Sequence, residues 1–215
     1  MIRAVLFDLD GTLADTAPDL AGAVNRQRIH RGLPPLPLDV LRPHASSGAR
    51  GLIGVGLGIT PAHETFESLR EEFLDLYERH MVVESTLFDG VEELLRSIAE
   101  RSLAWGIVTN KATRFTVPLV QRIGLADAGC VVCGDTTPHA KPHPAPLLEA
   151  ARQIGVPAEA CLYVGDDLRD IQAARAAGMG AIAAAYGYLG TGGPLAEWNA
   201  DAIIDLPLDL LAHLP

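Results

Sequence analysis

The sequence has 215 residues, of which 48% are hydrophobic and 20% are charged, and it contains no low-complexity tract. This composition is typical of a folded globular protein, and the length suits one α/β domain that carries a smaller insertion. The formal net charge of -10 would repel a polyanion, and no Lys/Arg stripe follows the chain, so we expect no nucleic-acid partner.

The N-terminus and the cysteines both bear on the compartment. Residues 1–3 lead directly into a short apolar run that ends at Asp8, which is too short for a signal-peptide core or a membrane span. Cys130 and Cys133 would point to opposite faces of an extended strand, so we expect reduced, buried thiols rather than a disulfide or a shared metal. These features predict a cytoplasmic protein that does not bind membranes.

Short apolar runs alternate with helical patterns along most of the chain. The apolarity of these runs is continuous rather than alternating, which predicts strands that are buried on both faces. Apolar residues spaced three and four apart follow the runs, as in helices that pack on a sheet. Together these patterns predict an α/β fold with a Rossmann-like, doubly wound parallel sheet. The expected strands cover residues 4–8, 104–109, 130–134, 161–166 and 181–185, and clear helical patterns cover 90–102 and 168–179.

One region interrupts this alternation after the first strand. Residues 16–84 contain helical patterns, such as 66–81, but no run with the apolarity of a strand. The Gly- and Ser-rich segment 43–61 predicts a loop with short helical pieces. We therefore expect a helical cap domain over 16–84, inserted into a Rossmann-like catalytic core formed by 1–15 and 85–215.

Polar side chains stand at the carboxyl ends of the expected strands. Asp8, Thr109 and Asp166 occupy such ends, and Asp10 follows Asp8 in a glycine-containing turn. Lys141 lies just before another expected helix. Because ligands of an open parallel sheet bind beyond the carboxyl ends of its strands, we expect these five residues to surround one crevice.

Several carboxylates in one crevice repel each other, and a bound divalent cation is the usual reason for such an arrangement. A ligand set that consists only of oxygen atoms favours Mg²⁺. We expect Asp8, Asp166 and Asp10, the last through a nearby backbone carbonyl, to hold the metal. Asp167 and Asp170 are expected to support it directly or through water, although negative charge at the start of a helix is favourable without any metal.

A lysine and a hydroxyl group complete a candidate phosphate site. Lys141 would neutralise charge, while Thr109, its neighbour Asn110 and backbone N–H groups would bind phosphate oxygens. Each residue also has a simpler interpretation. Thr109 could cap a helix, and Lys141 could be an ordinary surface lysine.

Four segments in this order resemble the motifs of the haloacid dehalogenase superfamily: FDLDGT (7–12), IVTNK (107–111), Lys141 in AKPHP, and VGDDLRD (164–170). The resemblance implies that Asp8 is a nucleophile that becomes phosphorylated and that Asp10 is the acid/base. It also implies phosphate binding by Thr109 and Lys141, a Mg²⁺ ligand in Asp166, and a supporting role for Asp170. The helical insertion is similar to the cap of this superfamily.

Within the superfamily, the sequence looks most like the phosphoglycolate phosphatases. Segments such as SSGARGL (46–52) and GDDLRDI (165–171) also resemble the bacterial branch that acts on N-acetylmuramic acid 6-phosphate. Either resemblance implies a small-molecule phosphomonoester substrate and a monomer or homodimer. Arg42, Ser47 and Arg50 in the cap are candidates for holding the leaving group, although polar residues in such a loop are often only solvated.

Alternative functions fit the sequence less well. A phosphomutase of the same fold would retain all four motifs, but it must shield its phospho-aspartate from water. A receiver-type signalling module has its phospho-acceptor at the end of a later strand and has no counterpart of the insertion. Dehalogenation needs no Mg²⁺ site, and a dinucleotide-binding domain would carry GxGxxG after the first strand, which is absent here.

Overall fold

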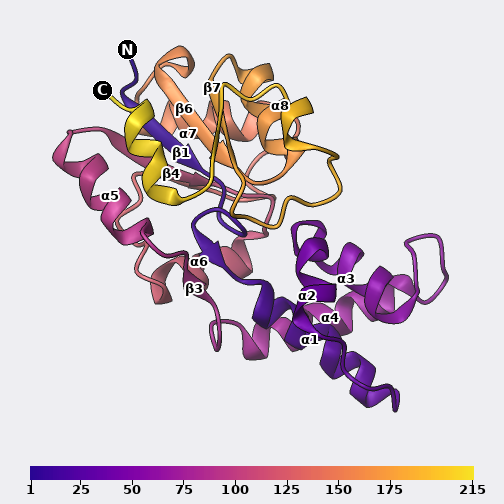
Figure 1. The fold of residues 1–215 in the computed structure, drawn as a ribbon. Coiled ribbons are helices and arrows are strands. Elements are labelled where there is room, and N and C mark those ends of the chain that lie inside the picture. The colour runs from indigo at the N-terminus through magenta and orange to yellow at the C-terminus, as the bar shows by residue number, and fades with distance from the viewer.

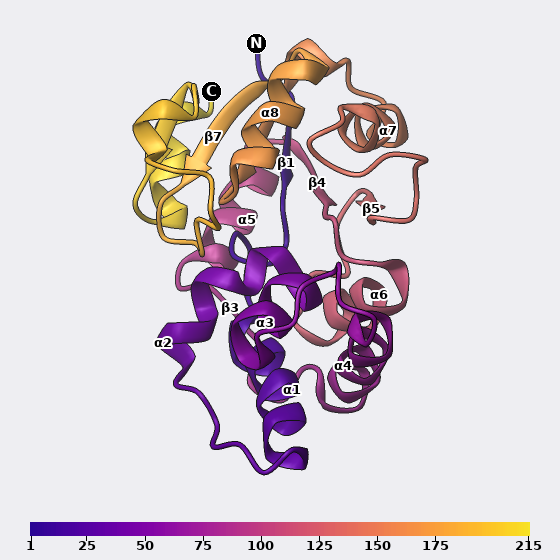
Figure 2. The ribbon, with the colours of Figure 1, turned by 90° about the vertical axis from the view of Figure 1, so that its right-hand side faces the viewer.

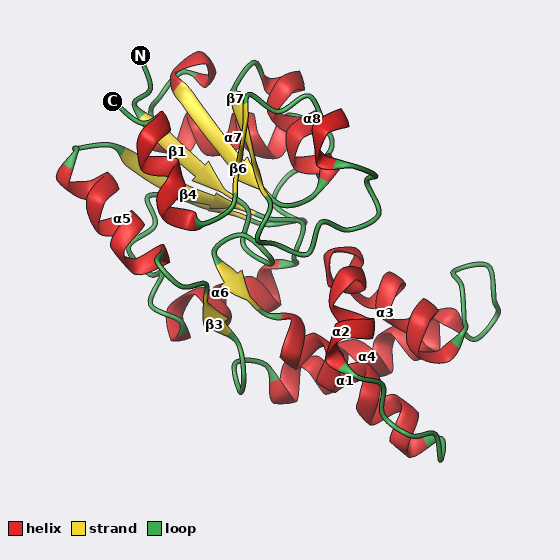
Figure 3. Cartoon of the chain, viewed as in Figure 1, coloured by secondary structure: helices red, strands yellow, loops and turns green.

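The computed structural model describes residues 1–215 and shows a parallel sheet with helices on both faces, next to a separate group of helices (Figures 1 and 3). The strand order is β5-β4-β1-β6-β7-β8, and every neighbouring pair is parallel. The predicted α/β class with a Rossmann-like sheet is confirmed. The strands are β1 (Ala4–Phe7), β4 (Ala104–Val108), β5 (Val131–Val132), β6 (Cys161–Gly165), β7 (Gly180–Ala184) and β8 (Ala202–Ile204).

The sheet separates two hydrophobic cores because successive side chains of a strand point to opposite faces. In β1, Val5 and Phe7 join one core, whereas Ala4 and Leu6 join the other. Apolar side chains of α5 (Val91–Glu100), α6 (Thr113–Arg122) and the 3₁₀ helix η4 (Pro207–His213) belong to the first core. Those of α7 (Ala145–Ile154) and α8 (Leu168–Ala177) belong to the second. Burial on both faces explains the continuous apolarity of the central strands.

Three short strands were not predicted from the sequence. One is β8, a three-residue edge strand, and Ile203 in its centre is 45% exposed. The others are β2 (Ala14–Asp15) and β3 (Thr86–Leu87), which pair antiparallel where the chain leaves and re-enters the sheet domain. Strands of two or three residues are too short to produce a recognisable hydrophobic period, so only the tertiary structure reveals them.

The segment between β2 and β3 is entirely helical or irregular, without a strand. Figure 2 shows its helices gathered beyond the carboxyl ends of the sheet strands. The boundaries 16–84 for a cap domain stay a prediction, and we refer to this helical segment as the cap. Its elements are α1 (Ala17–His30), α2 (Leu38–Leu41), the 3₁₀ helix η1 (Arg42–Ser47), α3 (Gly48–Leu57) and α4 (Phe66–His80).

The segment 43–61, predicted as a loop with short helical pieces, contains more helix than expected, and only its last residues lie outside a helix. The helical part forms η1 and the ten-residue helix α3, in which Leu52 and Ile53 are fully buried. Glycine favours the close approach of α3 to α1, because a Cβ on Gly56 would lie only 2.3 Å from Val24 Cγ2. Packing therefore outweighs the low helix propensity of four glycines in one helix.

The structure shows the state of the cysteines and the character of the helices, which both bear on the predicted compartment. All three cysteines are buried and unpaired, as predicted. None of the helices combines the length and the apolarity needed to cross a membrane.

Candidate active site

The candidate site lies at the carboxyl edge of the three central strands. Asp8 directly follows β1, Thr109 follows β4 and Asp166 follows β6, and β1 is the central strand of the three. From β1 the chain proceeds outward to β4 and β5 on one side, and it then returns to β6 on the other side of β1, which is the kind of switch point where open α/β sheets bind ligands. A cavity of about 260 Å³ opens between this edge and the cap. It is lined by Asp8, Asp10, Leu20, Ala45, Ser46, Ser47, Gly48, Thr109, Asn110, Lys111, Lys141, Asp167, Arg169 and Asp170.

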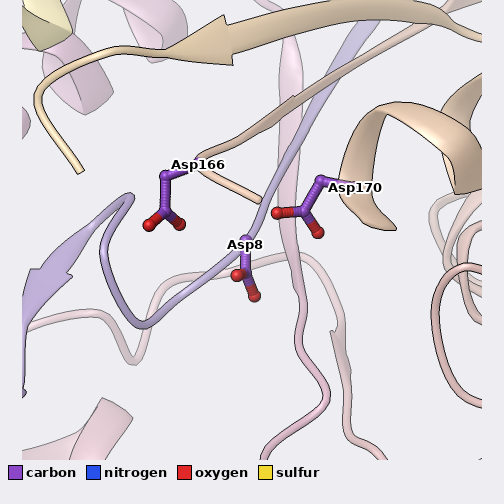
Figure 4. A group of neighbouring side chains, drawn as sticks. All are labelled: Asp8, Asp166 and Asp170. Carbon is purple, nitrogen blue, oxygen red and sulfur yellow. The ribbon is translucent and has the colours of Figure 1, made fainter. Parts of the chain in front are cut away.

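Three carboxylates meet beside this cavity. Asp8, Asp166 and Asp170 each offer an oxygen, and these oxygens lie within 4.8 Å of one another (Figure 4). Two members of the predicted metal set, Asp8 and Asp166, belong to this group of side chains, and the contribution of Asp10 through a backbone carbonyl stays a prediction. These three aspartates could hold a metal ion, since oxygen ligands and clustered negative charge suit a hard cation.

Burial of this cluster disfavours negative charge. Burial, together with the charges of Asp170 and Asp10, raises the pKa of Asp8 to about 7 despite the nearby Lys141 ammonium. The pKa of Asp166 is raised well above its usual value by burial, and by Asp8 and Asp170. The Oδ1 atom of Asp8 is buried, and it lies 2.9 Å from the Lys141 ammonium. These carboxylates therefore lack sufficient positive charge from the protein alone.

Asp166 is held rigidly by the loops around it. Its Oδ1 accepts a hydrogen bond from Thr12 Oγ1 at 3.0 Å, and its Oδ2 accepts one from the backbone N–H of Tyr188 at 2.8 Å. Gly11 has a positive φ of 88°, and a Cβ at this position would lie 2.2 Å from Asp166 Oδ2. The turn after Asp8 therefore requires glycine for its backbone conformation and for its contact with Asp166.

Lys141 supplies the positive charge at the centre of the site. Its Nζ lies 2.9 Å from Asp8 Oδ1 and 2.7 Å from Asp170 Oδ1. It also donates hydrogen bonds to the Val108 carbonyl at 2.8 Å and to the Tyr163 hydroxyl at 2.7 Å. Burial alone would lower the pKa of Lys141, but Asp170 and Asp8 outweigh it, and the pKa is raised. Lys141 is therefore a buried cation and not an ordinary surface lysine.

Thr109 and Asn110, the two residues after β4, have different roles in the site. The side chain of Asn110 binds the backbone of Lys141 on both sides, donating to its carbonyl and accepting from its N–H, each at 2.9 Å. Asn110 thereby fixes the lysine. Thr109 is buried, and its Oγ1 accepts from the Lys111 N–H at 3.1 Å, so its hydroxyl hydrogen is available to the cavity.

Asp10 faces the cavity next to a lysine that sequence reasoning missed. Lys111 Nζ lies 3.0 Å from Asp10 Oδ1, which also accepts a hydrogen bond from the Thr16 hydroxyl. The ammonium group sits 4.7 Å from the centre of the Tyr77 ring, which the cap helix α4 contributes. Burial lowers the pKa of Lys111, but Asp10 and Tyr77 outweigh it and raise the pKa above its usual value. Lys111 belongs to the IVTNK segment, but nothing in the sequence around it indicated that it pairs with Asp10, 101 residues away.

The start of α8 connects the site to the cap. Asp167 caps this helix by accepting from the Arg169 N–H at 2.9 Å, and Asp170 accepts from the Asp167 N–H at 3.1 Å. The guanidinium of Arg169 binds both carboxylate oxygens of Asp167, at 2.8 and 2.9 Å, and donates to the Ser46 carbonyl at 2.8 Å. Arg169 was also missed, because a charged residue in the first turn of a helix is usually solvated.

The three cap candidates are not equivalent in the structure. Ser47 lines the cavity, together with Ser46. Arg42 instead binds Asp15 Oδ1 at 2.7 Å and lies outside the cavity lining. Arg50 is exposed and lines a neighbouring cavity. The structure therefore brings together all of the predicted core residues but only one of the predicted cap residues.

Comparisons with known proteins extend over nearly the whole chain. A model of the haloacid dehalogenase-like hydrolase family matches residues 5–184. An N-acetylmuramic acid 6-phosphate phosphatase of Pseudomonas aeruginosa is 44% identical, with 98% of this chain and 93% of that protein covered. A phosphoglycolate phosphatase of Xanthomonas campestris is 47% identical, with 97% of this chain and 94% of that protein covered.

A solved structure supports the same assignment. A predicted phosphoglycolate phosphatase from Haemophilus somnus has a TM-score of 0.86 and 27% identity, with 100% of this chain and 98% of that chain covered. The predicted resemblance to this superfamily and the predicted class of phosphoric monoester hydrolase are confirmed. The chain belongs to the haloacid dehalogenase-like hydrolase family.

Proposed function

We propose that the chain is a Mg²⁺-dependent phosphomonoesterase that transfers the phosphoryl group of a small metabolite first to Asp8 and then to water. One observation carries this proposal. Asp8 stands at the carboxyl end of β1, with its buried Oδ1 paired to the Lys141 ammonium and with two further aspartates close by. A carboxylate placed in this way can act as a nucleophile once its charge is balanced.

The residues of the acidic cluster fit Mg²⁺. The donor set consists of carboxylate oxygens that lie within 4.8 Å of one another, and the single charge of Lys141 does not balance three aspartates. Asp8 and Asp166 would hold the metal together with the backbone carbonyl of Asp10, and Asp170 would support it. When bound, Mg²⁺ would balance the charge of the aspartates and of the phosphoryl oxygens.

In the first half of the reaction, a carboxylate oxygen of Asp8 attacks phosphorus, and the bond from phosphorus to the leaving oxygen breaks. Asp10 gives its proton to that oxygen, so an alcohol departs. Lys141 and the Thr109 hydroxyl bind the phosphoryl oxygens as charge redistributes. In the second half, Asp10 takes a proton from water, which attacks phosphorus and breaks its bond to Asp8. Inorganic phosphate leaves, and the free carboxylate of Asp8 is restored.

The cavity suits a small anionic substrate. Its lining includes the cations Lys111, Lys141 and Arg169 beside four aspartates whose charge Mg²⁺ would offset. Its volume of about 260 Å³ lies below the roughly 300–1,000 Å³ that is usual for drug-sized ligands. Phosphoglycolate is therefore the first candidate substrate. N-acetylmuramic acid 6-phosphate is the alternative, because relatives named for the two activities have similar identities of 47% and 44%.

A panel of small phosphomonoesters with added Mg²⁺ tests the proposal through the release of inorganic phosphate. We expect hydrolysis of at least one compound, and we expect Asp8→Asn to lower kcat at least about 10³-fold because the nucleophile is lost. Asp75→Asn, at an exposed position on the cap helix α4, is the matched control and should be fully active.

Mass spectrometry of the acid-quenched reaction should show a phosphoryl group on the peptide that contains Asp8. Full activity of Asp8→Asn would exclude the mechanism. Transfer of the phosphoryl group to a second sugar hydroxyl without release of phosphate would indicate a phosphomutase instead.

A further inference from the structure

A second cavity of about 650 Å³ lies beside the candidate active site. Ser47, Asp167 and Arg169 line both this outer cavity and the inner cavity that contains Asp8. These three residues therefore form the wall between the two spaces. The remaining lining residues of the outer cavity come from the cap and from the first turns of α8 and the loop after β7: His44, Arg50, Gly51, Gly54, Val55, Thr60, Pro61, Leu168, Gln172, Thr191 and Gly192.

Arg169 is the part of this wall that can move most easily. Asp167 is fixed as the cap of α8, and Ser47 has a short side chain. The side chain of Arg169 is 37% exposed, and one hydrogen bond, from Nη2 to the Ser46 carbonyl at 2.8 Å, joins it to the cap. Rotation of this guanidinium away from Ser46 would connect the inner cavity with the outer one.

The outer cavity has the chemistry of a binding site for an anionic, hydrogen-bonding group. Arg50 lines it and forms no ion pair within the chain, and Gln172 and Thr191 add polar side chains. The acid in the lining, Asp167, is already paired with Arg169 through two hydrogen bonds. A carboxylate with neighbouring amide or hydroxyl groups would therefore find a free guanidinium and hydrogen-bond partners there.

We propose that Arg169 is a specificity-determining residue, which closes the inner cavity around short leaving groups and must swing aside for long ones to reach the outer cavity. This inference rests on the proposed function. With Arg169 in place, its Nη1, which makes no hydrogen bond, can pair with the carboxylate of a two-carbon leaving group. A leaving group of sugar size extends past this position and meets Arg50.

The proposal predicts opposite effects on short and long substrates. Arg169→Ala removes the partner of a short carboxylate and opens the wall for a long leaving group. We expect the kcat/KM for N-acetylmuramic acid 6-phosphate, divided by that for phosphoglycolate, to rise about tenfold or more in Arg169→Ala. Arg169→Lys keeps the charge but not the planar fork, so its ratio should lie between those of the wild type and Arg169→Ala.

Two further variants make the test specific. Arg50→Ala should lower kcat/KM for the amino-sugar phosphate while leaving the value for phosphoglycolate within about twofold. Arg152→Ala is the matched control, because this exposed arginine binds both oxygens of Glu149 in the same manner, at 2.8 and 2.6 Å, outside both cavities. Its substrate ratio should equal that of the wild type.

Equal changes of kcat/KM for both substrates in Arg169→Ala would overturn the inference, because a merely structural role would affect both alike. The same result in an Arg169→Ala enzyme that still hydrolyses both substrates would leave the proposed function intact. A wild-type protein that hydrolyses no phosphomonoester in the presence of Mg²⁺ would overturn the proposed function and the inference together.

Discussion

The buried lysine at the centre of the site shows how single residues create its electrostatics. Lys141 is 5% exposed, and it contacts two carboxylates, a carbonyl and a hydroxyl group. Burying an ion is costly unless it is paired and its hydrogen bonds are satisfied, and the four partners meet that condition. The same lysine only partly neutralises three neighbouring aspartates, which leaves the site ready for another cation.

Asn110 provides a test of how strongly the position of this lysine matters. Asn110→Ala removes two hydrogen bonds to the Lys141 backbone, and we expect a loss of about 2 kcal/mol in the free energy of unfolding. Because Lys141 would no longer be held in place, we also expect kcat/KM to fall about tenfold or more. Denaturant unfolding and steady-state kinetics measure the two effects.

A matched control for this variant lies in the cap. Asn25 makes the same pair of hydrogen bonds to the Leu36 backbone, at 2.9 and 2.8 Å. Asn25→Ala should therefore cost similar stability but leave kcat/KM unchanged. Similar activity losses in both variants would show that lowered stability, rather than the position of Lys141, causes the effect.

At the scale of secondary-structure elements, α3 shows how packing can use glycine inside a helix. Gly56 lies against Val24 of α1, whereas a Cβ on Gly54 would meet no atom within 4 Å. The two positions are two residues apart on the same helix, so they differ mainly in what their missing side chains would contact.

We expect opposite effects from alanine at these two positions. Gly56→Ala should lower the free energy of unfolding by about 1–3 kcal/mol, because the new methyl group overlaps Val24. Gly54→Ala should raise it by up to about 1 kcal/mol, because alanine favours the helix and space is available. Urea unfolding of both variants measures the difference. A stabilised Gly56→Ala protein would show that α1 and α3 separate easily.

At the scale of the whole molecule, the sheet and the cap contribute different parts of one cavity. The sheet edge supplies the charged groups, and the cap supplies Leu20, Ala45, Ser46, Ser47 and Gly48. Within the cap, the carboxylate of Asp19 in α1 accepts from the N–H groups of Val83, Glu84 and Ser85, so the first cap helix holds the segment that returns to β3. The acidic cluster, by contrast, belongs entirely to the sheet domain.

This cluster makes the stability of the metal-free protein depend on pH. Burial raises the pKa of Asp8 to about 7 and that of Asp166 well above 3.8. The folded state therefore retains protons that the unfolded chain releases, so the free energy of unfolding falls as pH rises from about 4 to about 7. A bound cation would remove this penalty by favouring the charged carboxylates.

Mg²⁺ should therefore raise the Tm more at about pH 8 than at about pH 5.5, where protons compete for the same carboxylates. Differential scanning fluorimetry at several Mg²⁺ concentrations measures this shift, with NaCl at equal ionic strength as the control. In Asp166→Asn the Mg²⁺ effect should be much smaller at both values. An equal shift at both pH values in the wild type would argue against metal binding by this cluster.

Local patterns in the sequence were sufficient to predict the main strands of the sheet and the edge where the candidate site lies. The runs ending at Asp8, Thr109 and Asp166 are apolar throughout because their strands are buried on both faces. Parallel strands place their carboxyl ends at one edge, so the polar residues that directly follow them meet there for any conformation of the connecting loops. The central strands and the edge at which their polar residues meet thus followed from short stretches of chain.

Only the tertiary structure decided which long side chains reach the cavity. Arg42 and Arg50 were candidates for holding the leaving group, but Asp15 binds the first and the second lines the outer cavity. Lys111 and Arg169 line the inner cavity instead. The direction of a flexible cationic side chain depends on partners that are distant in the sequence, such as the Ser46 carbonyl, 123 residues before Arg169. The sequence by itself therefore determined the fold class and the aspartate at the end of β1, whereas long-range contacts decided what surrounds that aspartate.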